Sequence, residues 1–133
     1  MELTEKLQNL ENNVTVLRDI QKNITLDEMR RNKRYEWEIR YGLFESIQIV
    51  IDVACKISSH YNLGNPKNYK ECVELLKKHN YLTDALAQRI ISMVGLRNLL
   101  VHEYAEIDDA KLYNFLNYLD DFIAFAEEMQ ENL

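Results

Sequence analysis

The chain has few of the residues that build turns, and it has no long apolar run. Its 133 residues include only three glycines and one proline. This leaves little material for hairpins and argues against a many-stranded sandwich or barrel. No stretch of about 18 uncharged apolar residues is present, so no membrane-spanning helix is expected. The start, MELTEKLQNLENN, has neither a basic segment nor an apolar core, so no secretory signal is expected.

Cysteine and net positive charge are scarce as well. Cys55 and Cys72 could pair, but without a visible signal two reduced thiols in a cytoplasmic protein are the favoured interpretation. The formal net charge is −6. Proteins that bind nucleic acid over their whole surface are usually basic, so any RNA contact here must be local, or must come from a dimer that concentrates its few cations.

Apolar residues recur at helical spacing along most of the chain. With 47% hydrophobic and 29% charged residues, the composition suits a single globular domain over 1–133. We predict an all-α fold, an antiparallel up-and-down bundle of about five helices. The expected helices cover residues 3–17, 25–60 after a Thr25 capping box, a short stretch from Tyr69 to Leu76 with Tyr69 inward, a helix capped by Thr83, and a last one capped by Asp108.

Positive charge gathers in one place, among aromatic residues. Guanidinium groups bind phosphate and rings stack on bases, so this pattern suits RNA; a solvated helix face with pairs such as Glu36–Arg40 explains it equally well. The candidate RNA-contacting residues are Arg30, Arg31, Lys33, Arg34 and Arg40, interleaved with Tyr35, Trp37 and Tyr41.

Asp52 stands between Ile51 and Val53 in the most apolar part of the second helix. A buried carboxylate needs a partner. The favoured interpretation is a structural pair with a core arginine or tyrosine; the alternative is that Asp52 orients a cation of an active site.

The segment Gly95–Tyr104 places polar residues in a run that otherwise resembles core. Arginine is almost never fully buried unless it is paired, so Arg97 should face a cleft, an acidic partner or a subunit boundary. On an unbroken helix, Arg97 and His102 project about 140° apart. Either the helix ends near His102, or the two side chains meet across a two-fold axis. Gly95 permits a close approach of backbones, which favours the second arrangement and hence a homodimer.

An arginine and a histidine brought together could cleave RNA. An imidazole titrates near neutral pH and can exchange a proton with a 2′-hydroxyl or a 5′-oxygen. A guanidinium can hold the phosphate oxygens as negative charge develops. For the Arg97/His102 spacing alone, an ion-paired arginine and a satisfied helix-end histidine is the commoner explanation. The histidines lack zinc-ligand spacing and no phosphate-binding glycine loop is present, so neither metal nor other cofactor is expected.

The run Arg97-Asn98-Leu99-Leu100-Val101-His102-Glu103-Tyr104 resembles the R-x4-H-x-Y motif of HepT-like toxins, within the HEPN ribonuclease superfamily. Four other parts of the chain are similar to that family too: Met93–Leu96, Ile47–Ala54, the Leu63–Pro66 loop and the acidic last helix. The resemblance covers nearly the whole chain.

This resemblance implies a toxin of a type II toxin–antitoxin pair. It implies a dimeric helical bundle and a metal-independent endoribonuclease, with Arg97 and His102 as catalytic residues in a cleft between subunits. Asn98 and Asp52 are the supporting polar candidates. The implied partner is MntA, a minimal nucleotidyltransferase that places AMP on the motif tyrosine, here Tyr104, within a larger hetero-oligomer. A non-catalytic helical module that partners such a nucleotidyltransferase stays open, because the net charge is acidic.

Overall fold

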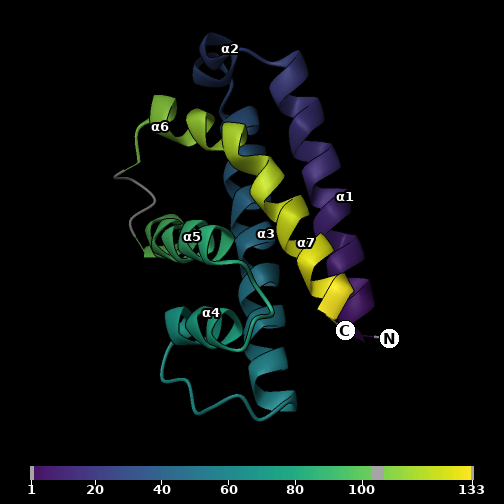
Figure 1. Ribbon diagram of the computed structural model, residues 1–133. Coiled ribbons are helices and arrows are strands. Elements are labelled where there is room, and N and C mark those ends of the chain that lie inside the picture. Colours follow the sequence, from purple (N-terminus) through teal and green to yellow (C-terminus); the bar gives the residue numbers. More distant parts are fainter. Residues whose placement is uncertain (1, 103–106, 133) are drawn as a thin grey trace.

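The computed structural model describes residues 2–102 and 107–132, and these residues form helices without any strand (Figure 1). The all-α prediction is confirmed. The helices are α1 (Glu2–Asn23), α2 (Leu26–Arg31), α3 (Lys33–His60), α4 (Tyr69–Lys78), α5 (Asp84–His102), α6 (Asp109–Asn114), the 3-10 helix η1 (Phe115–Tyr118) and α7 (Leu119–Asn132).

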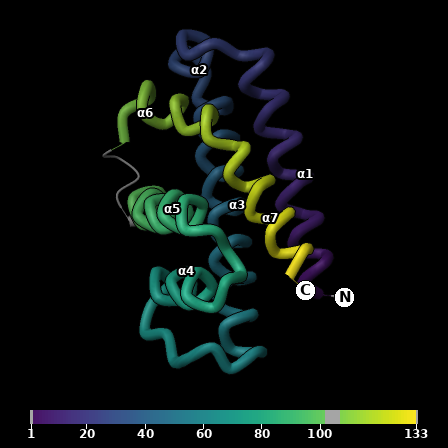
Figure 2. Tube along the Cα trace, in the orientation of Figure 1, coloured from purple at the N-terminus to yellow at the C-terminus, as the bar shows by residue number. Residues whose placement is uncertain are grey.

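The long helix α3 is the spine of the molecule. Its 28 residues span about 42 Å, and it packs against each of the other six α-helices. Helix α1 runs along it and α7 runs beside α1, whereas α4 and α5 cross α3 and are seen nearly end-on in Figure 1. The trace in Figure 2 shows α6 returning to the α2 end and α7 descending beside α1, so the start of α1 and the end of α7 lie together. This crossing brings the C-terminal half of α5 against the middle of α3.

The predicted apolar faces form the core. On α3, the residues Ile39, Leu43, Ile47, Val50, Ala54 and Ile57 are all buried. The buried residues of α1 include Leu7, Leu10, Val14 and Leu17. Gly42 lets these two helices approach, because a β-carbon there would lie 2.8 Å from Leu17 Cδ2. The prediction that Tyr69 points inward is wrong, because this first residue of α4 is exposed and its ring lies near Arg97 of α5 rather than in the core.

Capping residues explain where several of the helices begin and end. Thr25 and Glu28 form the predicted capping box, and the Asp108 side chain accepts from the Lys111 backbone N–H at 2.9 Å. Thr83 instead binds the Glu128 carboxylate through its backbone N–H and hydroxyl. Asn80, with φ of 64°, follows the last turn of α4 in the left-handed conformation that asparagine tolerates.

Two predicted helices are interrupted. Residues 25–60 are not one helix, because Asn32 has an extended backbone and its side chain accepts from the Arg34 N–H at 3.0 Å, which starts α3 afresh. The last helix is also divided, since residues 115–118 tighten into a 3-10 turn where Asn117 accepts from Gln21 of α1 at 2.7 Å.

The prediction of reduced thiols is wrong for this structure. Cys55 of α3 and Cys72 of α4 form a disulfide across a sequence separation of 17 residues. The Ser58 hydroxyl, beside this link, donates to the Cys72 carbonyl at 3.2 Å. The disulfide therefore ties α4 to α3 near the point where α5 also crosses. Within the described residues, no helix is both long and apolar enough to span a bilayer.

Candidate active site

Arg97 is held at the crossing of α5 with α3 and α4. Its Nε donates to Gln48 Oε1 of α3 at 3.1 Å. Its Cζ lies 5.8 Å from the ring centre of Phe44 and 5.4 Å from that of Tyr69. Both distances are within the range of cation–π attraction. Arg97 is partly buried, and these contacts fix the plane of its guanidinium.

Asp52 belongs to the same group of contacts, but not in the way predicted. It is not a buried carboxylate beside a core arginine or tyrosine, because its side chain is 44% exposed. Its Oδ1 accepts from Gln48 Nε2 at 2.9 Å, and its Oδ2 lies 3.9 Å from Lys6 Nζ of α1. The carboxylate reaches the surface between α1 and α3, and solvent and Lys6 supply the partners that a core position would have lacked.

The rest of the polar segment is only partly visible. Asn98 is exposed and its Oδ1 accepts from Arg97 Nη1 at 3.3 Å. Helix α5 reaches His102 without a break, so Arg97 and His102 share one helix. The His102 side chain and Tyr104 lie outside what the structure describes. A β-carbon added to Gly95 would have no described atom within 4 Å, so this surface of α5 is open. The homodimer stays a prediction.

The basic cluster lies at the other end of the same spine. Arg30, Arg31, Lys33 and Arg34 are exposed on α2 and the first turn of α3. Lys33 Nζ lies 5.7 Å from the Trp37 ring and Arg34 Cζ 5.6 Å from the Tyr35 ring, so cations and aromatics are interleaved in space as in sequence. The predicted Glu36–Arg40 pair is present at 3.9 Å. Measured along α3, Arg34 is about 21 Å from Gln48, so these four cations do not reach the contacts around Arg97.

An aromatic pocket connects the cluster to Arg97. It has a volume of about 430 Å³ and is lined by Trp37, Arg40, Tyr41 and Phe44 of α3 with Leu100 and Val101 of α5. Trp37 and Tyr41 are both about 60% exposed. Phe44 is a wall of this pocket and also lies against the Arg97 guanidinium. The Tyr41 hydroxyl donates to Glu45 at 2.8 Å, which raises the pKa of Tyr41.

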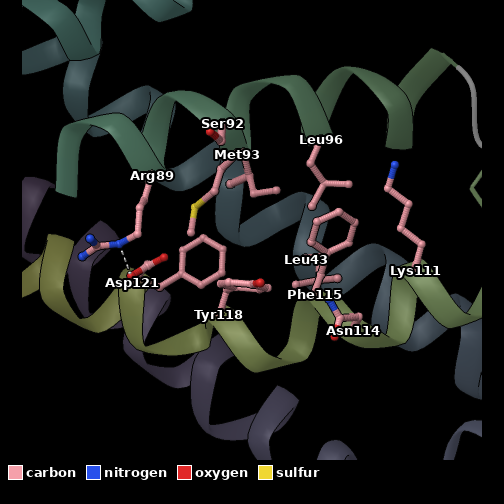
Figure 3. A pocket seen from close by; sticks show the side chains of 12 residues that line it. Leu43, Arg89, Ser92, Met93, Leu96, Lys111, Asn114, Phe115, Tyr118 and Asp121 are labelled. Atoms are coloured by element: carbon pink, nitrogen blue, oxygen red, sulfur yellow. Dashed lines mark hydrogen bonds and ion pairs between the residues drawn. The ribbon is translucent and has the colours of Figure 1, made fainter. Parts of the chain in front are cut away.

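A second pocket lies on the other side of α5 and contains none of the residues around Arg97. Figure 3 shows it between α5 and the segment from α6 to α7, with apolar walls such as Met93, Leu96 and Phe115. Its volume is about 330 Å³, and the Arg89–Asp121 ion pair, with a distance of 2.8 Å, closes one end. Among the described residues, no group of three or more histidine, cysteine or acidic side chains could hold a metal ion.

Sequence reasoning missed three of the side chains that hold Arg97: Gln48, Phe44 and Tyr69. Their contacts join positions between 28 and 53 residues apart, which no local pattern reports. The one available signal was the i, i+4 spacing of Gln48 and Asp52, which places an amide and a carboxylate on one face of a helix.

This arrangement can be compared with known proteins. The family model described as "Ribonuclease HepT-like" matches residues 10–129. The chain belongs to the ribonuclease HepT-like family. Arg97, Gln48 and Asp52 all lie inside the matched range, and the predicted family is confirmed.

Two curated members of the family are similar in sequence. The mRNA nuclease HepT of Shewanella oneidensis is 35% identical over 78 residues, 58% of this chain and 59% of that protein. The tRNA nuclease HepT of Aphanizomenon flos-aquae is 34% identical over 76 residues, 54% of this chain and 52% of that protein. The aligned regions thus span between half and three-fifths of these relatives.

A solved HepT-like fold agrees with the architecture. The tri-AMPylated Shewanella oneidensis HEPN toxin, in complex with the MNT antitoxin, superimposes with a TM-score of 0.88 and 22% identity, covering 97% of this chain and 96% of that one. At this identity the similarity establishes the fold, an all-α HEPN-like arrangement.

Proposed function

We propose that this protein is the toxin of a type II toxin–antitoxin pair and acts as a metal-independent endoribonuclease. The observation that carries the proposal is the state of Arg97, a cation fixed by Gln48 and two rings on the helix that leads to His102. Among the residues that the structure describes, none accepts a hydrogen bond from Arg97 Nη2. Membership of the HepT-like family and two relatives named as mRNA and tRNA nucleases support the same reaction.

In the proposed reaction the 2′-hydroxyl of the substrate attacks the adjacent phosphorus. His102 exchanges the protons, taking one from the 2′-oxygen or giving one to the departing 5′-oxygen. Arg97 holds the non-bridging oxygens while negative charge develops on them. The products are a 2′,3′-cyclic phosphate and a 5′-hydroxyl. Because positions 97 and 102 of a helix face about 140° apart, a second copy would complete the active cleft, with the open surface at Gly95 near the two-fold axis. Sedimentation should then give about twice 15.8 kDa; a strict monomer contradicts the composite cleft.

The substrate reaches Arg97 along α3. The exposed cations Arg30, Arg31, Lys33 and Arg34 hold phosphates at a distance, and the aromatic pocket that includes Arg40 receives bases. A local basic surface of this kind is compatible with a net charge of −6.

The experiment that tests the activity measures cleavage of a fluorescent RNA in EDTA by the wild type and by Arg97→Ala and His102→Ala. Both variants should lose cleavage and growth inhibition with unchanged helical circular dichroism. Arg89→Ala is the matched control for Arg97, since Arg89 lies on the same helix but pairs with Asp121 at the other pocket. His60→Ala is the control for His102. Full activity of either site variant contradicts the assignment.

Neutralisation is proposed to occur at Tyr104. A partner nucleotidyltransferase of the MntA type would transfer AMP from ATP to its phenol, releasing pyrophosphate and adding bulk and negative charge beside the cleft. The AMPylated state of the structurally similar HEPN toxin supports this chemistry. Peptide mapping after incubation with the partner and Mg·ATP should find AMP on Tyr104, and Tyr104→Phe should escape neutralisation. Modification of another tyrosine contradicts the proposal.

The alternative is a non-catalytic module that only binds the nucleotidyltransferase, and the acidic net charge favours it. Such a module would form the complex but leave RNA intact at any concentration, so the cleavage assay separates the two functions.

A further inference from the structure

The amide of Gln48 joins a donor to an acceptor. Its Oε1 accepts from Arg97 Nε at 3.1 Å, and its Nε2 donates to Asp52 Oδ1 at 2.9 Å. Arginine can only donate and an ionised aspartate can only accept, so the orientation of the amide is determined by its two partners. Asp52 is itself anchored, since Lys6 of α1 lies 3.9 Å from its other oxygen. A chain of polar contacts therefore runs from α1 through α3 to α5.

The neutral amide of Gln48 lies between the Arg97 cation and the Asp52 carboxylate, and this order affects the charge at Arg97. A carboxylate in direct contact with Arg97 would fix the guanidinium, but it would also neutralise it and compete with a phosphate for the same N–H groups. The neutral amide of Gln48 fixes Nε without adding a charge next to the cation. The negative charge of Asp52 stays one side chain further away and is shared with Lys6 and solvent.

We propose that Gln48, oriented by Asp52, is a positioning residue that holds the Arg97 guanidinium with its Nη2 edge toward the RNA phosphate while leaving its positive charge uncompensated. Phe44 and Tyr69 confine the plane of the guanidinium, and Gln48 sets its rotation within that plane. The inference rests on the proposed ribonuclease function, because it assigns Gln48 a role in phosphate binding by Arg97.

The first measurement does not depend on RNA cleavage. Exchange of the Arg97 Nε–H proton with water, followed by nuclear magnetic resonance, should be slow in the wild type because that proton is bonded to Gln48. Gln48→Met has a side chain of similar size without the acceptor, so exchange of this proton should accelerate at least tenfold. Gln88→Met is the matched control, because Gln88 is an exposed glutamine on α5, and it should leave the exchange unchanged.

The second measurement is the single-turnover cleavage rate at saturating RNA, compared with the RNA concentration that gives half the maximal rate. Gln48→Met should lower the maximal rate roughly 10- to 150-fold, the typical effect of one lost hydrogen bond to a charged group, and change half-saturation by less than threefold. Gln48→Glu keeps the acceptor but brings a negative charge to Arg97 and opposes Asp52, so it should weaken RNA binding as well. Asp52→Asn retains an oxygen acceptor for Gln48, so it should lower the maximal rate less than Asp52→Ala does; an equal loss in both variants would contradict the orienting role of Asp52.

The outcomes are distinguishable. Unchanged proton exchange in Gln48→Met, or fast exchange with an unchanged cleavage rate, overturns the positioning role. If Gln48→Met does not fold, Asp52→Ala takes its place, because it leaves Gln48 in position but removes the acceptor that orients its amide. Asp52→Ala should accelerate exchange of the Arg97 Nε–H proton and slow RNA cleavage. An unchanged exchange rate and an unchanged cleavage rate would again overturn the inference. A wild-type protein with slow Arg97 exchange but no RNA cleavage refutes the proposed function and the role in phosphate binding, while retaining the Gln48–Arg97 bond as a structural contact.

Discussion

Replacing Arg97 with lysine tests whether the geometry of the guanidinium matters, or only its charge. In the structure Arg97 Nε donates to Gln48 and Nη1 donates to Asn98, whereas no described residue accepts a hydrogen bond from Nη2. Lysine has a single ammonium, which can bind the amide or the phosphate but cannot repeat both contacts in the same plane. The substitution therefore keeps the positive charge and removes one charge-assisted hydrogen bond.

The expected size of the effect follows from that single bond. A hydrogen bond to a charged group contributes about 1.5–3 kcal/mol. If it is lost in the transition state, Arg97→Lys should cleave RNA roughly 10- to 150-fold more slowly than the wild type. The free energy of unfolding should change by no more than about 1 kcal/mol, because a half-exposed cation over two rings contributes little and the ammonium retains part of it.

The assay is single-turnover cleavage of a fluorescent RNA in EDTA, with thermal unfolding followed in parallel. Arg89→Lys, on the same helix, should cleave at the wild-type rate. Cleavage by Arg97→Lys within threefold of the wild type, at an unchanged melting temperature, would refute the reasoning, because charge alone would then suffice.

Three further predictions concern the fold and the RNA surface. Under non-reducing conditions Cys72→Ser should lower the free energy of unfolding by about 3 kcal/mol, as expected when a disulfide loop of this length is opened. A reductant should abolish this difference between the variant and the wild type. Free thiols in the native protein would contradict the disulfide. The Thr25 backbone N–H and hydroxyl hold the pKa of Glu28 below its ordinary value of 4.5, so the Glu28 carboxylate stabilises the capping box fully above pH 4.5, and this contribution is lost as pH falls through the lowered pKa. The urea midpoints of wild type and Glu28→Gln should differ at pH 7 and converge in acid, and a constant gap would contradict the linkage. A plot of the logarithm of RNA affinity against the logarithm of salt concentration has a slope that reports phosphate contacts. This slope should become shallower by about one unit for each phosphate that the basic cluster no longer holds. An unchanged slope after alanine replaces Arg30, Arg31 and Arg34 together would mean that the cluster is only a solvated face.

The parts of the fold that sequence predicts are those decided by neighbours along the chain. The seam of α3 and the caps at Thr25 and Asp108 each depend on residues within one or two turns, and each is confirmed. Asn32 is also a local cap, but it stands among charged residues that suit a helix equally well, so the pattern did not reveal the break between α2 and α3.

The parts that could not be predicted depend on contacts between distant residues. Asp52 was expected in the core because its neighbours are apolar, whereas the space between α1 and α3 lets its carboxylate reach Lys6 and solvent. Arg97 was identified as a polar residue that needs a partner, but the partner, Gln48, is 49 residues away and meets it only where α5 crosses α3. The Cys55–Cys72 link likewise needed the packing of α4 on α3 to become visible.

The most direct test of the proposed chemistry uses two RNA oligonucleotides that differ by one oxygen. One is all-ribose; the other carries a 2′-deoxy sugar at the nucleotide where the first is cut. Both are incubated with the wild-type protein in EDTA, and the products are analysed by mass spectrometry. The proposed mechanism predicts that the all-ribose strand yields a 2′,3′-cyclic phosphate and that the substituted strand resists cleavage at that site. Cleavage of the 2′-deoxy strand there, or an absolute requirement for Mg²⁺, would contradict attack by the 2′-hydroxyl assisted by Arg97 and His102.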